Sequence, residues 1–318
     1  MLRPKISATS LAALALTAAC ATAQPKSIAD ELAQGNVQRI LFLGDSITYD
    51  GRYVTNFESW LLTRYSERDI EVIDVGLSSE TVSGLTEEGH ADGKFDRPYL
   101  MDRLESVLEK TDPDLVFACY GMNCGVYKPF DEDRFARYRD GITTLHDTVV
   151  KRGARVVHVT PPVYDAEYAS SHVAAYDAVL ARYGEWLLSK RAGGWEVIDL
   201  HGPMANEVQR RRERDPKFTF AQDGVHPGDD GHWFMAQQFI AYCGDAKAAS
   251  LRSVQELLGQ HAPLLPVISE RMSLMRDAWL TYTGHNHPYV PPGVPMDEAR
   301  AKREEITARI KSEIGAAK

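Results

Sequence analysis

One short stretch, residues 39–48, constrains the fold more than any other part of the chain. Residues 40–43 form an unbroken apolar run, Ile-Leu-Phe-Leu, and Gly44 follows directly. Such a run is typical of a strand buried on both faces of a parallel sheet. Ser46 would then lie just beyond the carboxyl end of the strand, at the edge where open α/β sheets bind ligands. Asp45 and Ser46 fit either a nucleophile or a simple helix cap, and this stretch alone does not decide between them.

Further apolar runs alternate with helical patterns along the chain. The pattern predicts five strands, at residues 39–43, 70–75, 114–120, 155–159 and 195–200, and helices at 57–65, 100–108, 135–151, 174–191 and 231–242. Strands and helices that alternate at this spacing form right-handed βαβ units and a parallel sheet covered on both faces. We therefore expect an α/β fold with a five-stranded parallel sheet, preceded by a polar lead-in at 24–37 and carrying a long polar loop at 77–97.

The two ends of the chain differ from this central pattern. Residues 1–23 have a basic start, a short apolar stretch and a small-x-small cleavage pattern, which together predict an export signal. A lipoprotein signal with Cys20 as the lipidated residue is the alternative. Residues 24–249 would form the main domain. Residues 250–318 would form a helical extension packed on the core, with helix at 250–278 and 298–314 and irregular chain at 285–295.

Composition excludes several classes of protein. The 318 residues carry a net charge of −9, which argues against a nucleic-acid binder and gives no attraction to anionic membranes. The apolar stretch within residues 1–23 is too short to span a bilayer, so we expect no stable membrane insertion. Three cysteines lie beyond the signal, too few for a disulfide scaffold. We expect Cys119 and Cys124 to be separate buried thiols rather than a bridge.

A serine hydroxyl becomes a nucleophile only when a base removes its proton and a carboxylate orients that base. The pattern Asp-x-x-His occurs at Asp223/His226 and again at Asp229/His232. Gly224 and Pro227 place the first pair in an irregular loop that can point into a cleft, so we assign Asp223 as orienter and His226 as base. The second pair lies at a helix start, where Asp229 is more simply a cap and His232 a surface or supporting residue.

An oxyanion that forms during acyl transfer must meet aligned hydrogen-bond donors. The second strand ends at Gly76, and Asn123 follows the third strand, at the same edge as Ser46. The backbone N–H groups of Ser46 and Gly76 and the side-chain amide of Asn123 would supply three donors. Each residue alone has an ordinary turn explanation, so the argument rests on their joint placement.

Four short motifs in this order resemble the sequence blocks of the SGNH, or GDSL-type, hydrolases. They are Gly44-Asp45-Ser46, Gly76, Gly121-Met122-Asn123 and Asp223-Gly224-Val225-His226, and the resemblance covers roughly residues 38–243. It implies a flavodoxin-like three-layer α/β/α sandwich and ester hydrolysis without a metal or another cofactor. It also implies a Ser46, His226 and Asp223 triad and an oxyanion hole of Ser46, Gly76 and Asn123. Many members have aspartate where this chain has Cys124, which leaves the orientation of Asn123 open.

The substrate is less well determined by the sequence. The acidic surface, the polar loop and the predicted export suit a short-chain, acetyl ester on extracellular carbohydrate. Candidate substrate contacts are Asp45, Tyr120, Tyr127 and Trp233, together with Tyr49, although core or rim packing is the preferred interpretation of each aromatic ring taken singly. A metal site at His285 and His287 is not expected, because no acidic or cysteine partner adjoins them and a solvated loop is the simpler interpretation.

Two alternatives remain open at this stage. A lysophospholipase or another lipid esterase would use the same motifs on longer acyl chains. A non-catalytic carbohydrate-binding protein could retain the scaffold without the activity, although the complete set of motifs argues against it. The sequence does not define the oligomeric state.

Overall fold

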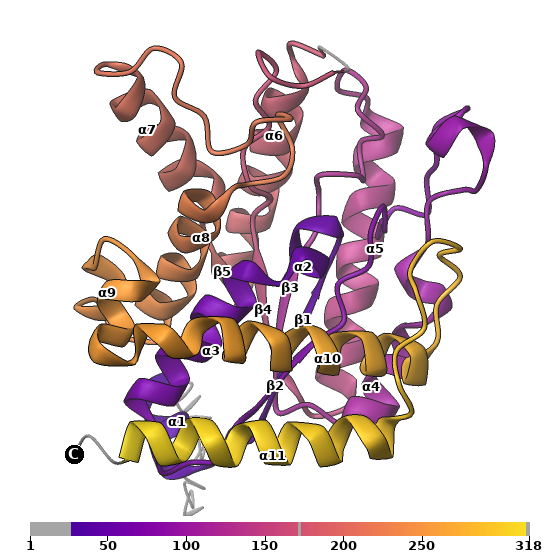
Figure 1. Ribbon diagram of the computed structural model, residues 1–318. Coiled ribbons are helices and arrows are strands. Elements are labelled where there is room, and N and C mark those ends of the chain that lie inside the picture. The colour runs from indigo at the N-terminus through magenta and orange to yellow at the C-terminus, as the bar shows by residue number, and fades with distance from the viewer. Residues whose placement is uncertain (1–26, 171–172, 316–318) are drawn as a thin grey trace, which may run out of the picture.

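A five-stranded parallel sheet forms the centre of the computed structural model, which describes residues 27–170 and 173–315 (Figure 1). The strands are β1 (Arg39–Gly44), β2 (Glu71–Asp74), β3 (Leu115–Cys119), β4 (Arg155–Val159) and β5 (Glu196–Ile198). Their order is β2-β1-β3-β4-β5, which is the flavodoxin-like order. The predicted sheet is therefore confirmed. The strand order changes direction between β1 and β3, where a ligand site is expected.

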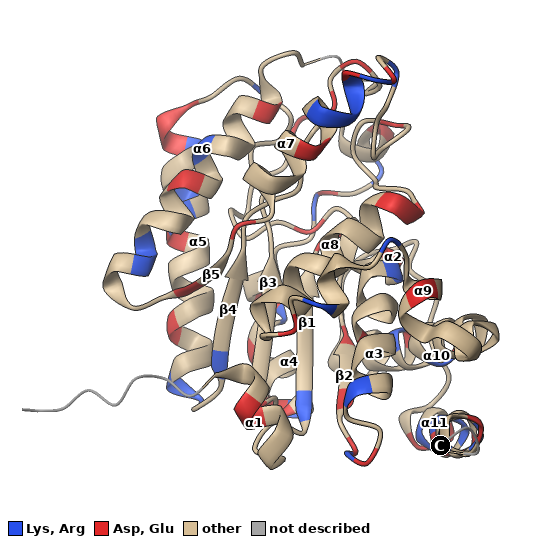
Figure 2. Ribbon diagram, turned by 90° about the vertical axis from the view of Figure 1, so that its left-hand side faces the viewer, with Lys and Arg blue, Asp and Glu red and all other residues tan. Residues whose placement is uncertain are grey.

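Helices cover both faces of this sheet and complete three layers (Figures 1 and 2). On one face, α3 (Arg52–Arg64) and α8 (Asp229–Tyr242) pack against each other. The other face carries α4 (Leu104–Thr111), α5 (Glu132–Lys151) and α6 (Tyr176–Ser189). The predicted helices are present, although several begin a few residues earlier than the apolar pattern indicates. Helix α3 starts at Arg52 because Gly51, with a φ of 80°, separates it from the short helix α2 (Ser46–Asp50).

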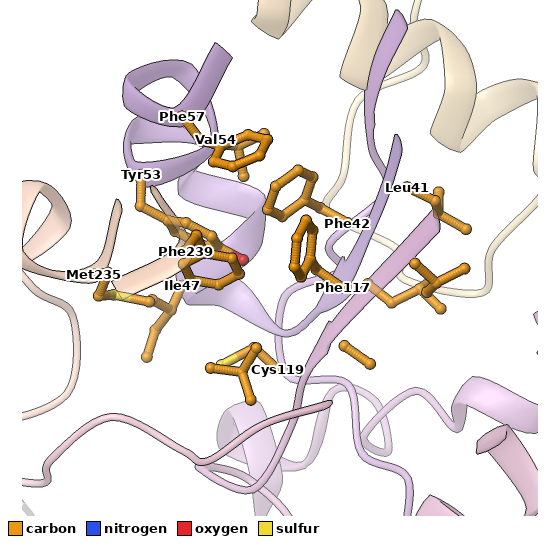
Figure 3. Packing of buried hydrophobic residues seen from close by; sticks show 14 of the residues in the cluster. Leu41, Phe42, Ile47, Tyr53, Val54, Phe57, Phe117, Cys119, Met235 and Phe239 are labelled. Atoms are coloured by element: carbon orange, nitrogen blue, oxygen red, sulfur yellow. The ribbon is translucent and has the colours of Figure 1, made fainter. Parts of the chain in front are cut away.

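A cluster of aromatic rings joins the sheet to the α3 and α8 layer (Figure 3). Phe42 of β1 and Phe117 of β3 are register partners, with ring centroids 5.2 Å apart. Phe239 of α8 lies 5.1 Å from the Phe117 ring, and Phe57 of α3 lies 5.4 Å from Phe42. All four side chains are buried. These edge and tilted contacts hold the strand that precedes Ser46 against its two covering helices.

One helix was not predicted. The polar lead-in at 24–37 contains α1 (Ile28–Gln34). Ser27 caps its N-terminus by accepting a hydrogen bond from the Asp30 N–H at 3.1 Å, and Gly35 ends it with a φ of 77°. Ile28 and Leu32 are the only apolar positions that it buries, one turn apart, which is too short a pattern to stand out in the sequence.

The C-terminal residues wrap around the β2 side of the sheet. The segment predicted as one helix at 250–278 is instead divided into α9 (Val254–Leu258), a 3₁₀ stretch and α10 (Leu265–Thr283), because Gly259 and Pro263 interrupt it. Figure 1 shows α10 crossing the molecule with α11 (Met296–Gly315) beside it.

A buried ion pair fixes this extension to the core. Arg271 of α10 donates to Glu58 of α3 at 2.8 Å and to Thr307 of α11 at 2.7 Å, and both charged side chains are almost fully buried. Loss of either charged partner would leave the other buried and unpaired, which is costly.

Several further expectations concern the ends, the thiols and the surface. The predicted export signal and Cys20 lie outside the described residues. Within the part of the chain that the structure describes, no helix is long and apolar enough to cross a bilayer. Cys119, Cys124 and Cys243 are free and buried, as separate thiols. Acidic and basic side chains are interspersed on the outer helices, α6 and α11 among them, without a single-sign stripe in this view (Figure 2).

Truncation of one central ring should show how much the aromatic cluster contributes to the stability of the fold. Phe239→Ala removes contacts with rings from both strands and from α3, and should lower the free energy of unfolding by about 3–5 kcal/mol. Urea denaturation followed by circular dichroism measures this. Val150→Ala, at a side chain that is 51% exposed, is the control and should change stability by less than about 0.5 kcal/mol. Equal losses in the two variants would contradict the proposed role of the cluster.

Candidate active site

Ser46 occupies the first turn of α2, directly after β1. The Asp45 side chain caps this helix by accepting a hydrogen bond from the Ile47 N–H at 3.1 Å. Gly44 is required at the turn, because a Cβ there would lie 1.9 Å from the Thr48 hydroxyl. The cap interpretation is therefore confirmed for Asp45, and it leaves Ser46 free for the other one. Asp45 is the cap, and the half-buried Ser46 is left with its hydroxyl at the sheet edge.

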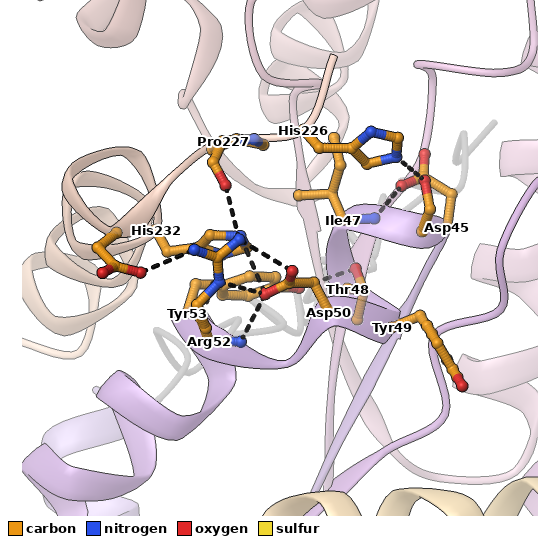
Figure 4. A network of polar contacts seen from close by, with 12 residues as sticks. Asp45, Ile47, Thr48, Tyr49, Asp50, Arg52, Tyr53, His226, Pro227 and His232 are labelled. Carbon is orange, nitrogen blue, oxygen red and sulfur yellow. Dashed lines mark hydrogen bonds and ion pairs between the residues drawn. The ribbon is translucent and has the colours of Figure 1, made fainter. Parts of the chain in front are cut away.

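Three side chains from distant parts of the chain form one hydrogen-bonded series at this edge. The Ser46 hydroxyl lies 2.8 Å from Nε2 of His226, and Nδ1 of His226 lies 2.7 Å from Oδ2 of Asp223. Figure 4 shows the His226 imidazole over the start of α2. The structure thus brings together the three residues that the sequence predicts. The side chains of His226 and Asp223 are 45% and 57% exposed, so the series lies in the open.

The loop that carries Asp223 and His226 is held by its own backbone. The second carboxylate oxygen of Asp223 accepts the N–H groups of Val225 at 2.9 Å and His226 at 2.7 Å. Burial alone would raise the pKa of Asp223, but these bonds and the His226 ring outweigh it and lower the pKa. Gly224 has a φ of 77°, and a Cβ there would lie 2.4 Å from the Asp165 carbonyl oxygen, so the turn accepts only glycine.

Asn123 lies at the carboxyl end of β3 with its amide fixed from both sides. Its Nδ2 donates to the Glu80 carbonyl at 3.2 Å, and its Oδ1 accepts the Tyr127 hydroxyl at 3.1 Å. These contacts answer the question raised by Cys124, because Tyr127 and the Glu80 backbone orient the amide. The Cys124 side chain is fully buried, which raises the pKa of its thiol to about 12 and makes it a poor nucleophile.

Gly76 does not lie as the sequence reasoning expects. Its N–H donates to Oδ1 of Asp74 at 2.8 Å and is not free for a substrate. A Cβ at Gly76 would lie 2.4 Å from the Tyr49 nitrogen and 2.7 Å from the Thr48 carbonyl carbon, so the glycine allows α2 to rest directly on the end of β2. The role predicted for Gly76 as an oxyanion donor is corrected to one of close packing.

The candidate substrate contacts separate into accessible and inaccessible residues. Tyr120 is 1% exposed and its hydroxyl donates to Glu80 at 2.7 Å, so it has no face for a ligand. Trp233 is 6% exposed, and its indole N–H donates to the Leu251 carbonyl, away from Ser46. Both predictions are wrong, because the loop after β2 covers Tyr120 and Trp233 is buried against the Leu251 segment. Tyr127 remains partly accessible next to Asn123.

The remaining predicted residues are more deeply placed than expected. Asp45 is 3% exposed, and burial raises its pKa to about 6 despite the Ile47 N–H and the nearby His226. His232, expected near the surface, is 1% exposed and accepts the Tyr53 N–H at Nδ1. His287, expected in a solvated loop, is 9% exposed and packs against the Phe95 ring. Among residues 27–170 and 173–315, no three metal-ligating side chains converge.

Two residues of the loop after β2 were missed by sequence reasoning. Glu80 is fully buried, and its carboxylate is held by Arg103 at 2.6 Å and by the Tyr120 hydroxyl. Ser79 has a left-handed φ of 64°, in a turn closed by the Glu80 N–H and the Leu77 carbonyl. A buried acid inside a polar loop has no signature in one sequence. The left-handed position would have been recognisable only if it were glycine.

Comparison with known proteins agrees with this architecture. Residues 42–234 match the model of the GDSL-like Lipase/Acylhydrolase family. Among solved structures, BT4096, described as a gut microbial diltiazem-metabolizing enzyme, has a TM-score of 0.55 and 25% identity over 65% of this chain. The chain spans about half of that enzyme, 47% of its length. A mutant of Axe2, an acetyl-xylooligosaccharide esterase from Geobacillus, has a TM-score of 0.50 and 22% identity over 65% of this chain and 94% of its own. A comparison with curated proteins gives no match.

These findings define the class of protein first. A five-stranded parallel sheet with Ser46 directly after β1, together with the match over residues 42–234, places the chain among the SGNH, or GDSL-type, hydrolases. The matched region covers more than half of the chain and contains all three residues of the hydrogen-bonded series. The chain therefore belongs to the GDSL-like Lipase/Acylhydrolase family.

The buried carboxylate beneath α2 should make stability depend on pH. Burial raises the pKa of Asp74 to about 7, although the Gly76 N–H and Arg276 favour its charged form, and its Oδ2 has no hydrogen-bond partner. Because the folded state holds this proton more tightly than the unfolded state, stability should fall as pH rises from about 4 to about 7. Asp74→Asn should remove much of this slope. Thermal unfolding between pH 4 and pH 8 measures it, and parallel curves for both proteins would exclude Asp74 as the cause.

Proposed function

We propose that this protein is a serine esterase that removes short acyl groups, acetyl above all, from carbohydrate through an acyl-enzyme. The observation that carries the proposal is the continuous series from the Ser46 hydroxyl through the His226 ring to Asp223, with both distances below 3 Å. The alternative of a non-catalytic binding protein gives no reason to keep this alignment.

Each residue of the series has a defined task. His226 Nε2 would take the proton of the Ser46 hydroxyl as its oxygen attacks the acyl carbon, and would then deliver it to the departing alcohol. Water would attack the acyl-serine with the same base. Asp223, kept ionised by its lowered pKa, holds the Nδ1 proton of the ring and stabilises the imidazolium. No metal or other cofactor enters this sequence of steps.

The negative charge of the tetrahedral intermediate needs donors other than Gly76. The Ser46 N–H at the start of α2 and the second Nδ2 hydrogen of Asn123 are two of them. We assign the third to the Ser79 N–H, which the turn from Leu77 to Glu80 leaves outside its own hydrogen bond. Asn123 binds the Glu80 carbonyl, so this turn lies beside its amide.

Two features support a carbohydrate substrate over a bilayer lipid. The triad is open to solvent and would admit a bulky acyl carrier. A cavity of about 310 Å³ adjoins the His226 loop, lined by Pro227 and Phe220 and by Tyr164, Asp165, Asp177 and Arg212. Aromatic faces combined with carboxylate and guanidinium groups suit the apolar faces and hydroxyls of a sugar. The predicted export signal would place such an enzyme where extracellular polysaccharide is found.

The solved structures also support an acetylated carbohydrate as the substrate. Three of the Axe2 structures are catalytic mutants of an acetylxylan esterase, with a serine, an aspartate or a histidine replaced by alanine. In that enzyme the aspartate and the histidine are three positions apart, as Asp223 and His226 are here. Identity near 22% supports the same fold but does not identify the substrate. The sugar and the acyl group are therefore to be identified by the measurements below.

Loss of the nucleophile should abolish hydrolysis without loss of the fold. Ser46→Ala should lower kcat for p-nitrophenyl acetate by more than about 10⁴-fold, because the remaining residues cannot form the acyl-enzyme. Circular dichroism should remain that of the wild type. A fluorophosphonate probe should label the wild type at Ser46 and leave Ser46→Ala unlabelled. Turnover in the variant equal to that of the wild type would exclude the proposed mechanism.

Substrate class should follow from acyl length and from the carrier. We expect kcat/KM to fall from acetyl to octanoyl esters of p-nitrophenol, and acetate to be released from acetylated xylan or another acetylated polysaccharide. Ser46→Ala serves as the blank for both measurements. A rate that rises with chain length, with lysophospholipid hydrolysed and polysaccharide untouched, would favour the lipid esterase alternative.

A further inference from the structure

We propose that Arg52 is a positioning residue, which holds the His226 loop against the segment that carries Ser46. The inference rests on the proposed function, because its consequence is the placement of the His226 ring over the Ser46 hydroxyl. Arg52 lies outside the hydrogen-bonded series itself and at the first position of α3.

Arg52 contacts the His226 loop through the backbone of that loop, and we call this contact the clamp. Arg52 Nη2 donates to the carbonyl oxygen of Pro227 at 3.0 Å, and Pro227 is the residue directly after His226 (Figure 4). Arg52 itself lies six residues after Ser46, and α2 and the single residue Gly51 separate the two. One guanidinium therefore links the backbone of the residue after His226 to the start of α3, six residues after Ser46.

The guanidinium is fixed before it reaches Pro227. Its Nε donates to Oδ1 of Asp50 at 2.6 Å and its Nη2 to Oδ2 of Asp50 at 2.9 Å, a two-point contact, while Nη1 donates to the exposed Asp229 at 2.7 Å. These contacts define the plane of the fork, so that the second hydrogen of Nη2 points at the Pro227 carbonyl. Lysine has one point charge and no such plane, and could not make all of these contacts together.

The buried His232 lies against Asp50. Nδ1 of His232 accepts the Tyr53 N–H at 3.2 Å, and its Nε2 lies 3.2 Å from Oδ1 of Asp50. Burial lowers the pKa of His232 to about 4, so the ring is neutral near pH 7 and carries its proton on the Asp50 side. The second Asp-x-x-His pair of the sequence is thus divided. His232 lies against Asp50, and Asp229 accepts a hydrogen bond from Arg52.

Other contacts of the loop run to a different part of the molecule. The Gly224 carbonyl accepts the Asp165 N–H at 2.9 Å, and Gly228 donates to the Phe220 carbonyl at 2.7 Å. These bonds fix the loop to the segment after β4 and to its own preceding stretch of chain, not to α2. Without Arg52, the Ser46–His226 separation would depend on these contacts and on the packing of α8 against α3, and an error of about 1 Å in such a separation can cost about 100-fold in rate.

The test compares Arg52→Ala and Arg52→Lys with Arg139→Ala. Arg139 is also an arginine paired with a carboxylate and is similarly exposed, but its partner Glu132 lies on the same helix, α5. With p-nitrophenyl acetate, Arg52→Ala should lower kcat by about 10- to 100-fold with little change in KM, and Arg52→Lys should lie between it and the wild type. Guanidinium ion, but not tetramethylammonium, should restore part of the Arg52→Ala rate. Arg139→Ala should match the wild type.

A second measurement separates this proposal from the function on which it rests. Amide hydrogen exchange of residues 223–230 should rise in Arg52→Ala and stay unchanged in Arg139→Ala, whether or not any ester is hydrolysed. Unchanged exchange, or a kcat equal to that of the wild type in both Arg52 variants, would overturn the clamp while leaving the esterase intact. If the wild type hydrolyses no ester and Ser46 is not labelled, the proposed function fails, and the exchange result alone decides whether Arg52 holds the loop. If Arg52→Ala does not fold, Arg52→Lys and its exchange pattern decide.

Discussion

The 2.8 Å contact between the Ser46 hydroxyl and the His226 ring is the interaction on which the site depends. The two residues are 180 positions apart, so no local preference of the chain can create the contact. It exists because the loop that precedes α8 returns to the edge of the sheet where β1 ends, and because both segments turn sharply. Gly44 allows α2 to start beside β1, and Gly224 allows the His226 loop to close against Asp165.

The same edge is unusually rich in buried charge. Asp45, Asp74 and Glu80 are all almost fully buried close to the nucleophile segment, and burial raises the pKa of the first two. Each carboxylate is compensated locally: Asp45 and Asp74 by a backbone N–H two residues along the chain, Glu80 by Arg103 and Tyr120. Buried groups of this kind cost free energy unless they are hydrogen-bonded, and their retention here fixes the loops around Ser46 in one geometry.

Residues outside the matched family region also bear on this geometry. Arg276 of α10 donates to the Tyr49 carbonyl at 2.6 Å and stacks on the Tyr49 ring, at the C-terminal end of the helix that begins with Ser46. A cation at a helix C-terminus satisfies its free carbonyls and complements the helix dipole. The helix that begins with Ser46 is thus capped by Asp45 at one end and by the C-terminal extension at the other.

The sequence by itself determined the sheet and most of its helices, and it singled out Ser46, Asp223, His226 and Asn123 as candidate site residues, because apolar runs, glycine turns and the Asp-x-x-His spacing are local patterns. The tertiary structure alone decided which polar groups are free. It buried Tyr120 and Trp233, and it joined Arg52 to Pro227. Hydrogen-bond partners and burial are set by contacts between segments far apart in the chain, and no pattern within a single segment records them.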